Sequence, residues 1–450
     1  MRAVWLALAF SGLVSAQGLT LEQAVKQAVE RYPSVKVSRE QVSAAAAGIA
    51  LARTAYLPRV DFLSAVNRAT RNNIYGMLMP QSVIAPISGP PVREATGSSV
   101  FGSAIGLHVA WAPFDFGLRK SEVDAAETAR RQAELAAERT KFEVSSSAAA
   151  AFLTILAAEE TVKAASAGVD RAKTVEGIVG ALVKAELRPG ADTARAHSEV
   201  AAAESQLIQA RQSVALAKAS LAQLVGGKVA AVEAGNLLAE APAAAPAEAA
   251  PATHPALREQ GAAIDSVLAR QKVLDKSVLP KFQIESSTYA RGTGARPDFT
   301  TLGGVNGLAP NFYNWGLGFT MNFGVTDWMT LKQRKEMESA HERTERAKLE
   351  LLEADLKTRL RKAQALTDGA RQLAAVTPLA LEAARVSEEQ ATARYRAGLG
   401  TMLEVAEAQR IRTQAEIDAR LARLSVWRGL LEAAIATGDL NEFIEKAKGN

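Results

Sequence analysis

The sequence has 450 residues, of which 48% are hydrophobic and 22% are charged. This much apolar material predicts a large ordered structure rather than a disordered chain. The 53 basic and 48 acidic side chains are interspersed and leave a formal net charge of only +5. Because no basic stripe of the kind that binds nucleic acid is present, we expect no nucleic-acid partner.

The first sixteen residues have the layout of a secretory signal peptide. Arg2 supplies the positive charge, residues 3–14 form a short apolar stretch, and small or modest residues precede the expected cleavage after Ala16. The sequence contains no cysteine, which excludes disulfides, thiolate metal ligands and a lipidated N-terminal cysteine. Export without disulfides is typical of a bacterial envelope protein.

Beyond this segment, no run of about 18 apolar residues predicts a transmembrane helix. The nearest candidate, residues 144–158, is uncharged but rich in Ala and Ser, and we interpret it as a buried stretch of helix. A part of the mature chain that crosses a membrane would have to be a closed β-barrel, because lipid cannot satisfy unpaired backbone groups.

The chain repeats its own pattern. Pro33 and Pro58 lie 25 positions apart, as do Pro255 and Pro280. Such self-similarity indicates two copies of one structural unit. Further identical residues recur 212 positions apart: Ala196, Ala210, Arg211, Ser213 and Gly226 match Ala408, Ala422, Arg423, Ser425 and Gly438. We predict a signal peptide (1–16), a first repeat (17–227), an Ala/Pro-rich linker (228–253), a second repeat (254–441) and a C-terminal tail (442–450).

Each repeat shows the same order of elements. An amphipathic helix leads to the second proline, and two strands and two long helices follow. The predicted helices before the strands cover 34–56 and 256–278; the strands cover 59–69, 99–111, 281–290 and 312–323; the long helices cover 119–185, 192–225, 326–396 and 402–437. The first repeat has 15 more residues between its strand landmarks, around 72–99, which predicts a longer external loop.

The strand predictions rest on alternation with a period of two. The last strand shows this alternation most clearly. One predicted face is apolar: Tyr313, Trp315, Leu317, Phe319, Met321 and Phe323. The other carries polar residues and glycines: Asn314, Gly316, Gly318, Thr320 and Asn322. Each strand has about 10 residues, the length that a tilted strand needs to cross a bilayer. This pattern is typical of a transmembrane barrel, although a soluble sandwich strand is an alternative for any single segment.

The helices carry coiled-coil seams. Leu349, Leu352, Leu356 and Leu360 follow three-four-four spacing, and Leu207, Val214 and Leu221 repeat every seven residues. About 70 helical residues at a rise of about 1.5 Å each make a rod of about 100 Å. Four strands cannot close a barrel alone, so several chains must contribute. Two chains would give eight strands and a filled interior, and three would give twelve strands and a lumen; a conduit favours three, but periodicity alone does not fix the number.

Three features together resemble the TolC-like outer membrane efflux family. They are the proline-bounded helix before each strand, the turn Pro-Phe-Asp-Phe-Gly at 113–117, and Tyr-Arg-Ala-Gly at 395–398 leading into Thr-Met-Leu-Glu-Val at 401–405. The ordered, duplicated set covers nearly the whole mature chain. The resemblance implies a mixed α+β membrane protein, with a long antiparallel α-helical coiled-coil barrel and four transmembrane β-strands per chain, that forms a 12-stranded β-barrel as a homotrimer.

The resemblance also implies the function. The protein would be the outer-membrane channel of a tripartite efflux or type I secretion system, a passive conduit rather than an enzyme, with no cofactor. Its partners would be a periplasmic adaptor (membrane fusion) protein, an inner-membrane pump and outer-membrane lipid. Its location would be the outer membrane of a Gram-negative-type bacterium, with the helices in the periplasm. The alternative is a soluble periplasmic coiled-coil scaffold; drugs, metal ions and proteins are all open as cargo.

Two acidic residues are candidates for the entrance of such a channel. Glu404 and Glu407 lie three apart, on one helix face, and the resemblance matches them to the acidic entrance constriction of the family. A ring of carboxylates from three chains would favour cations. Thr401 and Glu404 also fit a T-x-x-E capping box, which does not account for Glu407. The first repeat has Asp192 and Arg195 at the positions that match Glu404 and Glu407, so the pair of acids is a feature of the second repeat, which favours a functional role.

Turn residues mark the two helix tips. Pro189 and Gly190 lie at the first tip, and Gly398 and Gly400 lie at the second. We expect these tips to form a docking surface for the adaptor, although helix reversals require Gly and Pro in any case.

Polar residues on the strands are candidates for a pore lining: Asp61, His108, Asn314 and Asn322. The four histidines are scattered and lack zinc-site spacing, so we expect no metal site. No nucleophile and base pattern predicts a catalytic site.

Overall fold

The computed structural model describes residues 18–70, 99–239, 253–296 and 300–448. The predicted signal peptide, nearly all of the predicted long loop and much of the linker lie outside these residues. The chain divides into two compact units. A sheet unit comprises 44–130 and 264–344, and a helical unit comprises the described residues of 1–43, 131–263 and 345–450. Each unit is described by itself.

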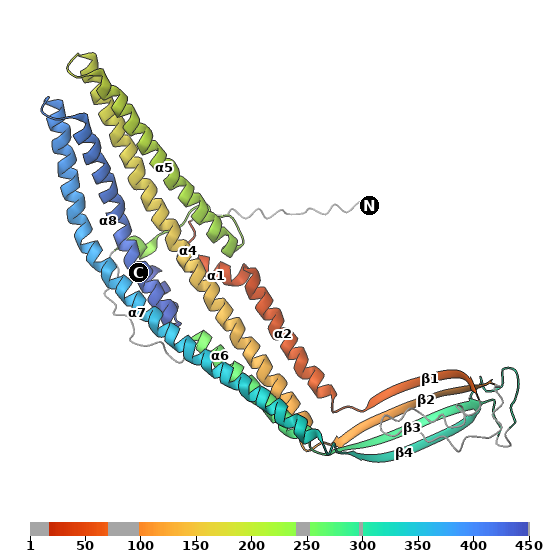
Figure 1. Ribbon diagram of the computed structural model, residues 1–450. Helices are drawn as coiled ribbons and strands as arrows, with labels where there is room; N and C mark the ends of the chain where they lie inside the picture. Colours follow the sequence, from red (N-terminus) through yellow and green to blue (C-terminus); the bar gives the residue numbers. More distant parts are fainter. Residues whose placement is uncertain (1–17, 71–98, 240–252, 297–299, 449–450) are drawn as a thin grey trace, which may run out of the picture. The chain divides into compact units, whose positions relative to one another are not determined.

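The sheet unit contains one four-stranded antiparallel sheet (Figure 1). Its strands are β1 (Arg59–Thr70), β2 (Ser99–Phe114), β3 (Lys281–Thr293) and β4 (Phe312–Asn322). They are ordered β1-β2-β3-β4, so the central β2–β3 pair joins the strands of the two predicted repeats. Consequently β1 and β4 form the two edges of the sheet, and each has one side that pairs with no other strand among the described residues.

Strand β2 extends three residues beyond its predicted end at 111. Its pairing with β3 shifts register between Trp111 and Phe114. Pro113 lies within this shift and has no N–H to donate to the ladder, so a bulge absorbs it and pairing resumes at Phe114.

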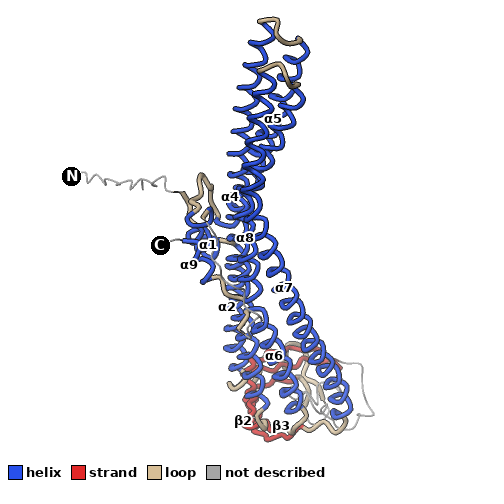
Figure 2. The backbone as a smooth tube through the Cα atoms, turned by 90° about the vertical axis from the view of Figure 1, so that its left-hand side faces the viewer, coloured by secondary structure: helices blue, strands red, loops and turns tan. Residues whose placement is uncertain are grey.

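The helical unit contains two long hairpins (Figure 2). In one, α4 (Leu118–Lys184) turns into α5 (Gly190–Val225), and in the other α7 (Asp327–Arg396) turns into α8 (Met402–Thr437). Two further helices, α2 (Pro33–Thr54) and α6 (Pro255–Ser277), precede β1 and β3. The helices α2, α4, α6 and α7 contribute residues to both units.

Short elements complete the helical unit. They are α1 (Leu21–Arg31), the 3-10 helix η1 (Gly235–Leu238) and α9 (Asn441–Lys448). The segment predicted as a C-terminal tail therefore contains a helix, which packs against α1, η1 and α8 through the buried Phe443 and Ala447. The N-terminal Leu19 forms a parallel bridge with Val232, in which its amide donates to Ala231 O at 3.0 Å.

The main core of the helical unit is built on the apolar part of α4. Phe152, Leu153 and Ile155 are fully buried, together with Leu221 of α5 and Trp427 of α8. Burying one such side chain contributes about 1.5–3 kcal/mol. The prediction of a buried helix stretch at 144–158 is therefore confirmed. In the described part of the chain, α4 is the one helix long and apolar enough to cross a membrane by composition, but half of its most apolar window is already buried within the chain.

Candidate functional site

Two short turns close the helix hairpins. In the turn after α7, Gly398 has a φ of 79°, and the Leu399 amide bonds back to Arg394 O at 2.9 Å. The turn after α4 has the same form, but Glu186 takes the left-handed position with a φ of 57°. A left-handed residue is a common way to end a helix, and glycine adopts it without the steric cost of a Cβ atom.

The four predicted tip residues all lie in or beside these turns. Pro189 is the N-cap of α5 and Gly190 is its first residue, while Gly398 follows α7 and Gly400 precedes the N-cap of α8. A Cβ atom on Gly190 would meet no atom within 4 Å. Gly398 is thus explained by its backbone conformation, whereas packing does not require glycine at 190.

A cluster of side chains links the two tips. Arg188, from the first turn, donates hydrogen bonds to Tyr395 O and to Gly400 O, the latter at 3.1 Å. Its guanidinium lies 4.3 Å from the Tyr395 ring centroid. The Tyr395 hydroxyl donates to Asp192 Oδ2 at 2.8 Å, which completes the link to α5. We call Arg188, Asp192 and Tyr395 the tip link.

The tip link rests on a small apolar core. Tyr395 is 1% exposed and packs with Val175, Val179, Ala196, Met402 and Val405. Burial, followed by the hydrogen bond to Asp192, raises the pKa of Tyr395 to about 12. The phenol therefore remains a hydrogen-bond donor at neutral pH. Sequence reasoning missed this cluster, although Tyr395 belongs to the motif that carried the resemblance and Asp192 had been noted as the counterpart of Glu404.

Glu404 lies in the first turn of α8, with its side chain exposed. Its amide donates to Thr401 Oγ1 at 3.3 Å, and the Thr401 hydroxyl donates to Glu404 Oε1 at 3.3 Å. The predicted cap is therefore present on the Thr401 side. Among the hydrogen bonds found in the described residues, none joins the Glu404 carboxylate to the Thr401 amide, so the reciprocal half of a capping box is not formed.

Glu407 is also exposed, but it is paired with Arg410. Arg410 Nη2 lies 2.7 Å from Glu407 Oε1, and Arg410 Nε lies 3.0 Å from Glu407 Oε2. The hydrogen bond from Arg410 holds the pKa of Glu407 below its usual value. The two predicted entrance carboxylates thus have different partners, a neutral hydroxyl for Glu404 and a cation for Glu407.

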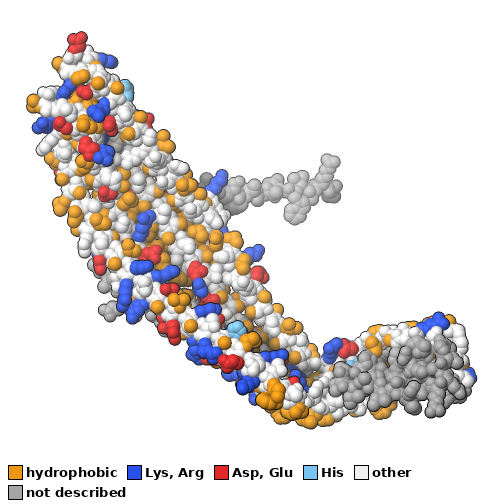
Figure 3. Space-filling view, viewed as in Figure 1, with side chains coloured by type: hydrophobic (Ala, Val, Ile, Leu, Met, Phe, Trp, Pro, Cys, Tyr) orange, Lys and Arg blue, Asp and Glu red, His pale blue; other side chains and the backbone are white. Residues whose placement is uncertain are grey.

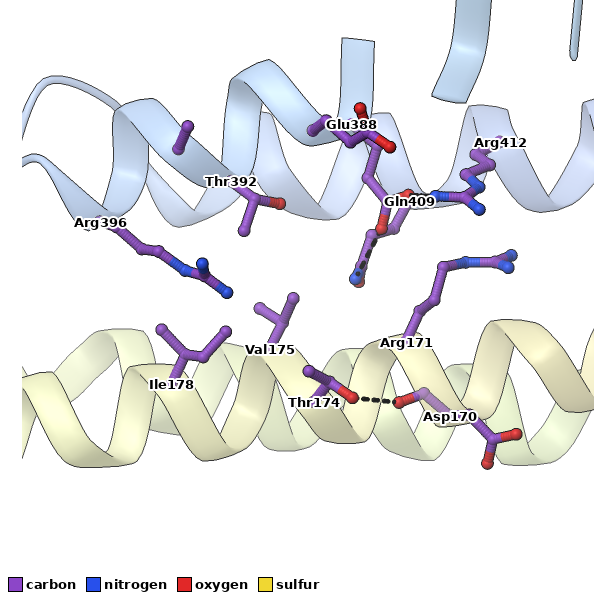
Figure 4. Close-up of a pocket in the computed structure, with 12 residues that line it drawn as sticks. Asp170, Arg171, Thr174, Val175, Ile178, Glu388, Thr392, Arg396, Gln409 and Arg412 are labelled. Atoms are coloured by element: carbon purple, nitrogen blue, oxygen red, sulfur yellow. Dashed lines mark hydrogen bonds and ion pairs between the residues drawn. The ribbon is translucent and has the colours of Figure 1, made fainter. Parts of the chain in front are cut away.

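A cleft of about 500 Å³, lined mostly by charged and polar residues, lies between α4 on one side and α7 and α8 on the other (Figure 4). Glu388, which is 5% exposed, accepts hydrogen bonds from Arg412 at 2.6 Å and Gln409 at 3.2 Å. From α4, Arg171 binds both oxygens of Glu416 at 3.0 and 3.1 Å. Buried charges persist only when paired, so this network holds the two hairpins in one register.

The predicted pore-lining residues lie on one face of the sheet. The register pairs Asp61 directly with His108, and it places Asn314 and Asn322 on the same side, opposite Tyr289 and Lys281. Small residues accompany them, with glycine at 102, 106, 316 and 318. Charges on this face are partly matched: Arg59 contacts Asp61 at 3.0 Å, and His108 Nε2 lies 4.0 Å from Glu285.

The opposite face of the sheet is apolar and exposed. On β4, Tyr313, Trp315 and Leu317 are 71%, 74% and 70% exposed. Hydrophobic side chains also gather where β4 ends and α7 begins (Figure 3), and Phe323, Val325, Trp328 and Met329 are all more than half exposed there. An apolar surface of this kind must be covered by lipid or by another chain.

Comparisons with known proteins agree with this arrangement. Residues 24–227, nearly all of the first predicted repeat, match the family model described as outer membrane efflux protein. The predicted resemblance to this efflux family is confirmed. The match also confirms the predicted function as an efflux channel component and the predicted location in the outer membrane. A search of the curated proteins gives no match.

Solved structures share the fold of this chain. CusC has a TM-score of 0.75 at 12% identity, covering 93% of this chain and 92% of CusC. The CmeC outer membrane channel of Campylobacter jejuni has a TM-score of 0.71 at 14% identity, covering 95% and 89%. The outer membrane protein VceC of Vibrio cholerae has a TM-score of 0.70 at 14% identity, covering 93% and 96%. The likeness spans both predicted repeats, including the second, which lies outside the family match.

Proposed function

We propose that three copies of this chain form a passive conduit from the periplasm to the exterior, as the outer-membrane channel of a tripartite efflux or type I secretion system. One observation carries the proposal: a four-stranded sheet with two unpaired edges has one apolar, exposed face and one polar face. In lipid such edges would leave backbone groups without partners, so the strands must pair with those of other copies.

The polar face supports a water-filled lumen. Twelve strands, four from each of three chains, leave room for an interior passage, whereas eight would be filled by side chains. In the proposed barrel, Asp61, His108, Asn314 and Asn322 line the interior, and the glycines beside them keep the passage wide. The exposed aromatic residues of β4 face lipid, and those where α7 begins lie at the membrane surface, where aromatic girdles are common.

The helices form the periplasmic tunnel of the proposed channel. In it, Glu404 and Glu407 face the axis at the entrance, and the tip link holds the two hairpins of each copy together. The tip turns carry Leu187 and Leu399, which are 69% and 72% exposed. This apolar surface, with Pro189, Gly190, Gly398 and Gly400, supports docking of a periplasmic adaptor, which in turn binds the inner-membrane pump.

The test is electrical. Purified full-length protein, extracted from the outer-membrane fraction with detergent, should insert into a planar lipid bilayer and give discrete conductance steps. A soluble scaffold, the competing function, would appear in the periplasmic fraction without detergent and would leave the bilayer silent. Two neighbouring variants form a matched pair. Trp315→Lys, on the apolar face, should prevent insertion because a cation in the lipid-facing band of a barrel costs roughly 2–4 kcal/mol at the bilayer midplane. Asn314→Lys, on the polar face, is the control and should insert.

A further inference from the structure

The two entrance carboxylates differ in how far a neighbouring cation offsets their charge. Glu407 and Arg410 form a bidentate ion pair, with the shortest N–O distance at 2.7 Å. Both side chains are at least half exposed, so the pair lies on the solvent side of α8 rather than in its packing. Glu404 has no such cation among the described residues, where its carboxylate accepts a hydrogen bond from the Thr401 hydroxyl.

The charge of the second tip supports a role for this arginine. Residues 394–412 contain four arginines (Arg394, Arg396, Arg410, Arg412) and two acids (Glu404, Glu407), a formal sum of +2. The first tip, residues 184–200, contains three basic and three acidic residues (Lys184, Arg188, Arg195; Glu186, Asp192, Glu199) and sums to zero. Arg412 is bound to the buried Glu388. The entrance is therefore not simply acidic, and its effect on small ions depends on which charges remain unpaired.

We propose that Arg410 sets the ion preference of the entrance, by pairing with Glu407 so that Glu404 supplies the net negative charge. The inference rests on the proposed function, because it assumes that this face of α8 lines the entrance. Two opposite charges in contact act on a passing ion as a dipole, whose field decays faster than that of a free carboxylate. Three copies would then present three effective negative charges to small cations rather than six.

The pair also explains how Glu407 stays ionised. Six carboxylates around one axis would repel one another, and like charges raise each other's pKa values. A guanidinium held against Glu407 acts in the opposite direction, since it stabilises the charged form. Arg410 would therefore limit cation preference at neutral pH and preserve what remains of it in mild acid.

The experiment compares four forms of the full-length channel in planar bilayers under a KCl gradient. Counting Glu404, Glu407 and Arg410, the charge per chain is −1 in the wild type, −2 in Arg410→Gln, 0 in Glu407→Gln, and −1 in the double variant. We expect Arg410→Gln to raise the potassium-to-chloride permeability ratio by roughly twofold or more, as one added unit charge should. Glu407→Gln should lower the ratio, and the double variant should return near the wild-type ratio.

A second measurement separates charge from structure. In Arg410→Gln, Glu407 loses the partner that lowers its pKa, so cation preference should fall at a higher pH than in the wild type. Arg385→Gln is the matched control, because Arg385 forms similar pairs with Glu382 and Glu389 within α7 and should leave the ratio unchanged. An Arg410→Gln channel with the wild-type ratio and pH profile, or a double variant that behaves as Glu407→Gln, would overturn the inference. Failure of every form, wild type included, to conduct would refute the conduit itself.

Discussion

At the scale of single residues, the tips are held by one phenol. Tyr395 donates its hydroxyl to Asp192 and accepts at its carbonyl a hydrogen bond from Arg188. Hydrogen bonds to a charged acceptor are stronger than neutral ones, and burial strengthens this one further. Because Arg188 lies in the first turn, Asp192 follows that turn and Tyr395 precedes the second, this contact joins the two hairpins where each one reverses.

The change Tyr395→Phe tests this contact. It removes one charge-assisted hydrogen bond, worth about 1.5–3 kcal/mol, while it keeps the ring in its apolar core. We expect faster amide hydrogen exchange at 186–192 and 395–401, and a larger mean conductance if the tip narrows the channel. Tyr56→Phe, at an exposed position in the sheet unit, is the control. Unchanged exchange at both tips would show that the hydroxyl does not hold them.

His254 is a second residue whose chemistry depends on its position. It is 5% exposed, and the Ala256 amide donates to its Nδ1 at 3.1 Å while its Nε2 lies 3.2 Å from Ile435 O. This pattern assigns the neutral form with the proton on Nε2. Burial lowers the pKa of His254 most, the bond to Ile435 opposes this, and Arg139 and Arg359 lower it further.

The stability supplied by His254 should therefore depend on pH. Its pKa is about 6.5 in an unfolded chain and lower in the folded one, so the unfolded state binds more protons and folding weakens as pH falls below about 6.5. We expect the protection of the amides at 255–259 from hydrogen exchange, measured relative to the intrinsic exchange rate at each pH, to decrease between about pH 7.5 and pH 5.5. His254→Asn, whose amide can donate and accept hydrogen bonds without titrating, should remove this dependence of protection on pH. His197→Asn, which changes a side chain that is 66% exposed, is the control and should keep it. A flat wild-type profile would contradict this account.

At the scale of elements, the joint from β2 into α4 explains why the Pro-Phe-Asp-Phe-Gly sequence stands there. Asp115 accepts hydrogen bonds from the amides of Gly117 and Arg119, at 3.1 and 2.9 Å, and caps the start of α4. Gly117 has a φ of 85°, which favours glycine. The buried side chain of Arg119 binds Asp115 at 2.7 Å and Ala55 O at 3.3 Å, so it ties the end of α2 to the joint.

Arg119→Met should weaken this joint. It keeps the length of the side chain but leaves Asp115 without its cation, and breaking a buried pair from one side costs about 3–5 kcal/mol. We expect faster hydrogen exchange at 115–121 and a lower temperature of unfolding. The further change Asp115→Asn should recover part of the loss, because the orphaned charge is then gone. A single variant as stable as the wild type would mean that the joint does not depend on this pair.

At the scale of the whole molecule, the proposed trimer would form by pairing of the sheet edges β1 and β4 of neighbouring copies. The chain has no natural cysteine, so a cysteine at Val60 on β1 and one at Met321 on β4, both 60% exposed, can be cross-linked selectively. With a flexible bismaleimide of about 10 Å, about twice the spacing of paired strands, we expect a covalent trimer as the largest product. Each single-cysteine variant is the control and should remain uncross-linked. Products that grow past three chains would argue for an open array instead of a closed barrel.

Local pattern accounts for most of the elements and less of the site. The alternation at 312–322 and the helix breaks at Pro189 and Gly398 are patterns within a few residues, so the sequence shows them directly. The bounds of β4, α5 and α7 agree with the predictions from these patterns to within two residues at each end. Helix α9 was not predicted, because eight residues are too few to show a clear helical periodicity. The bulge in β2 was not predicted, because the Pro113–Gly117 sequence also fits a turn.

By itself the sequence determined the order of strands and long helices and the face of each strand that is apolar, since these follow from the spacing of side chains along the backbone. Only the tertiary structure decided which distant side chains meet. Arg171 binds Glu416 across 245 positions, and Tyr395 binds Asp192 across 203. Neither pair can be predicted from the neighbouring sequence, because the same charged or phenolic residue can be solvated in one fold and buried against a partner in another. Packing of one hairpin on the other supplies that difference.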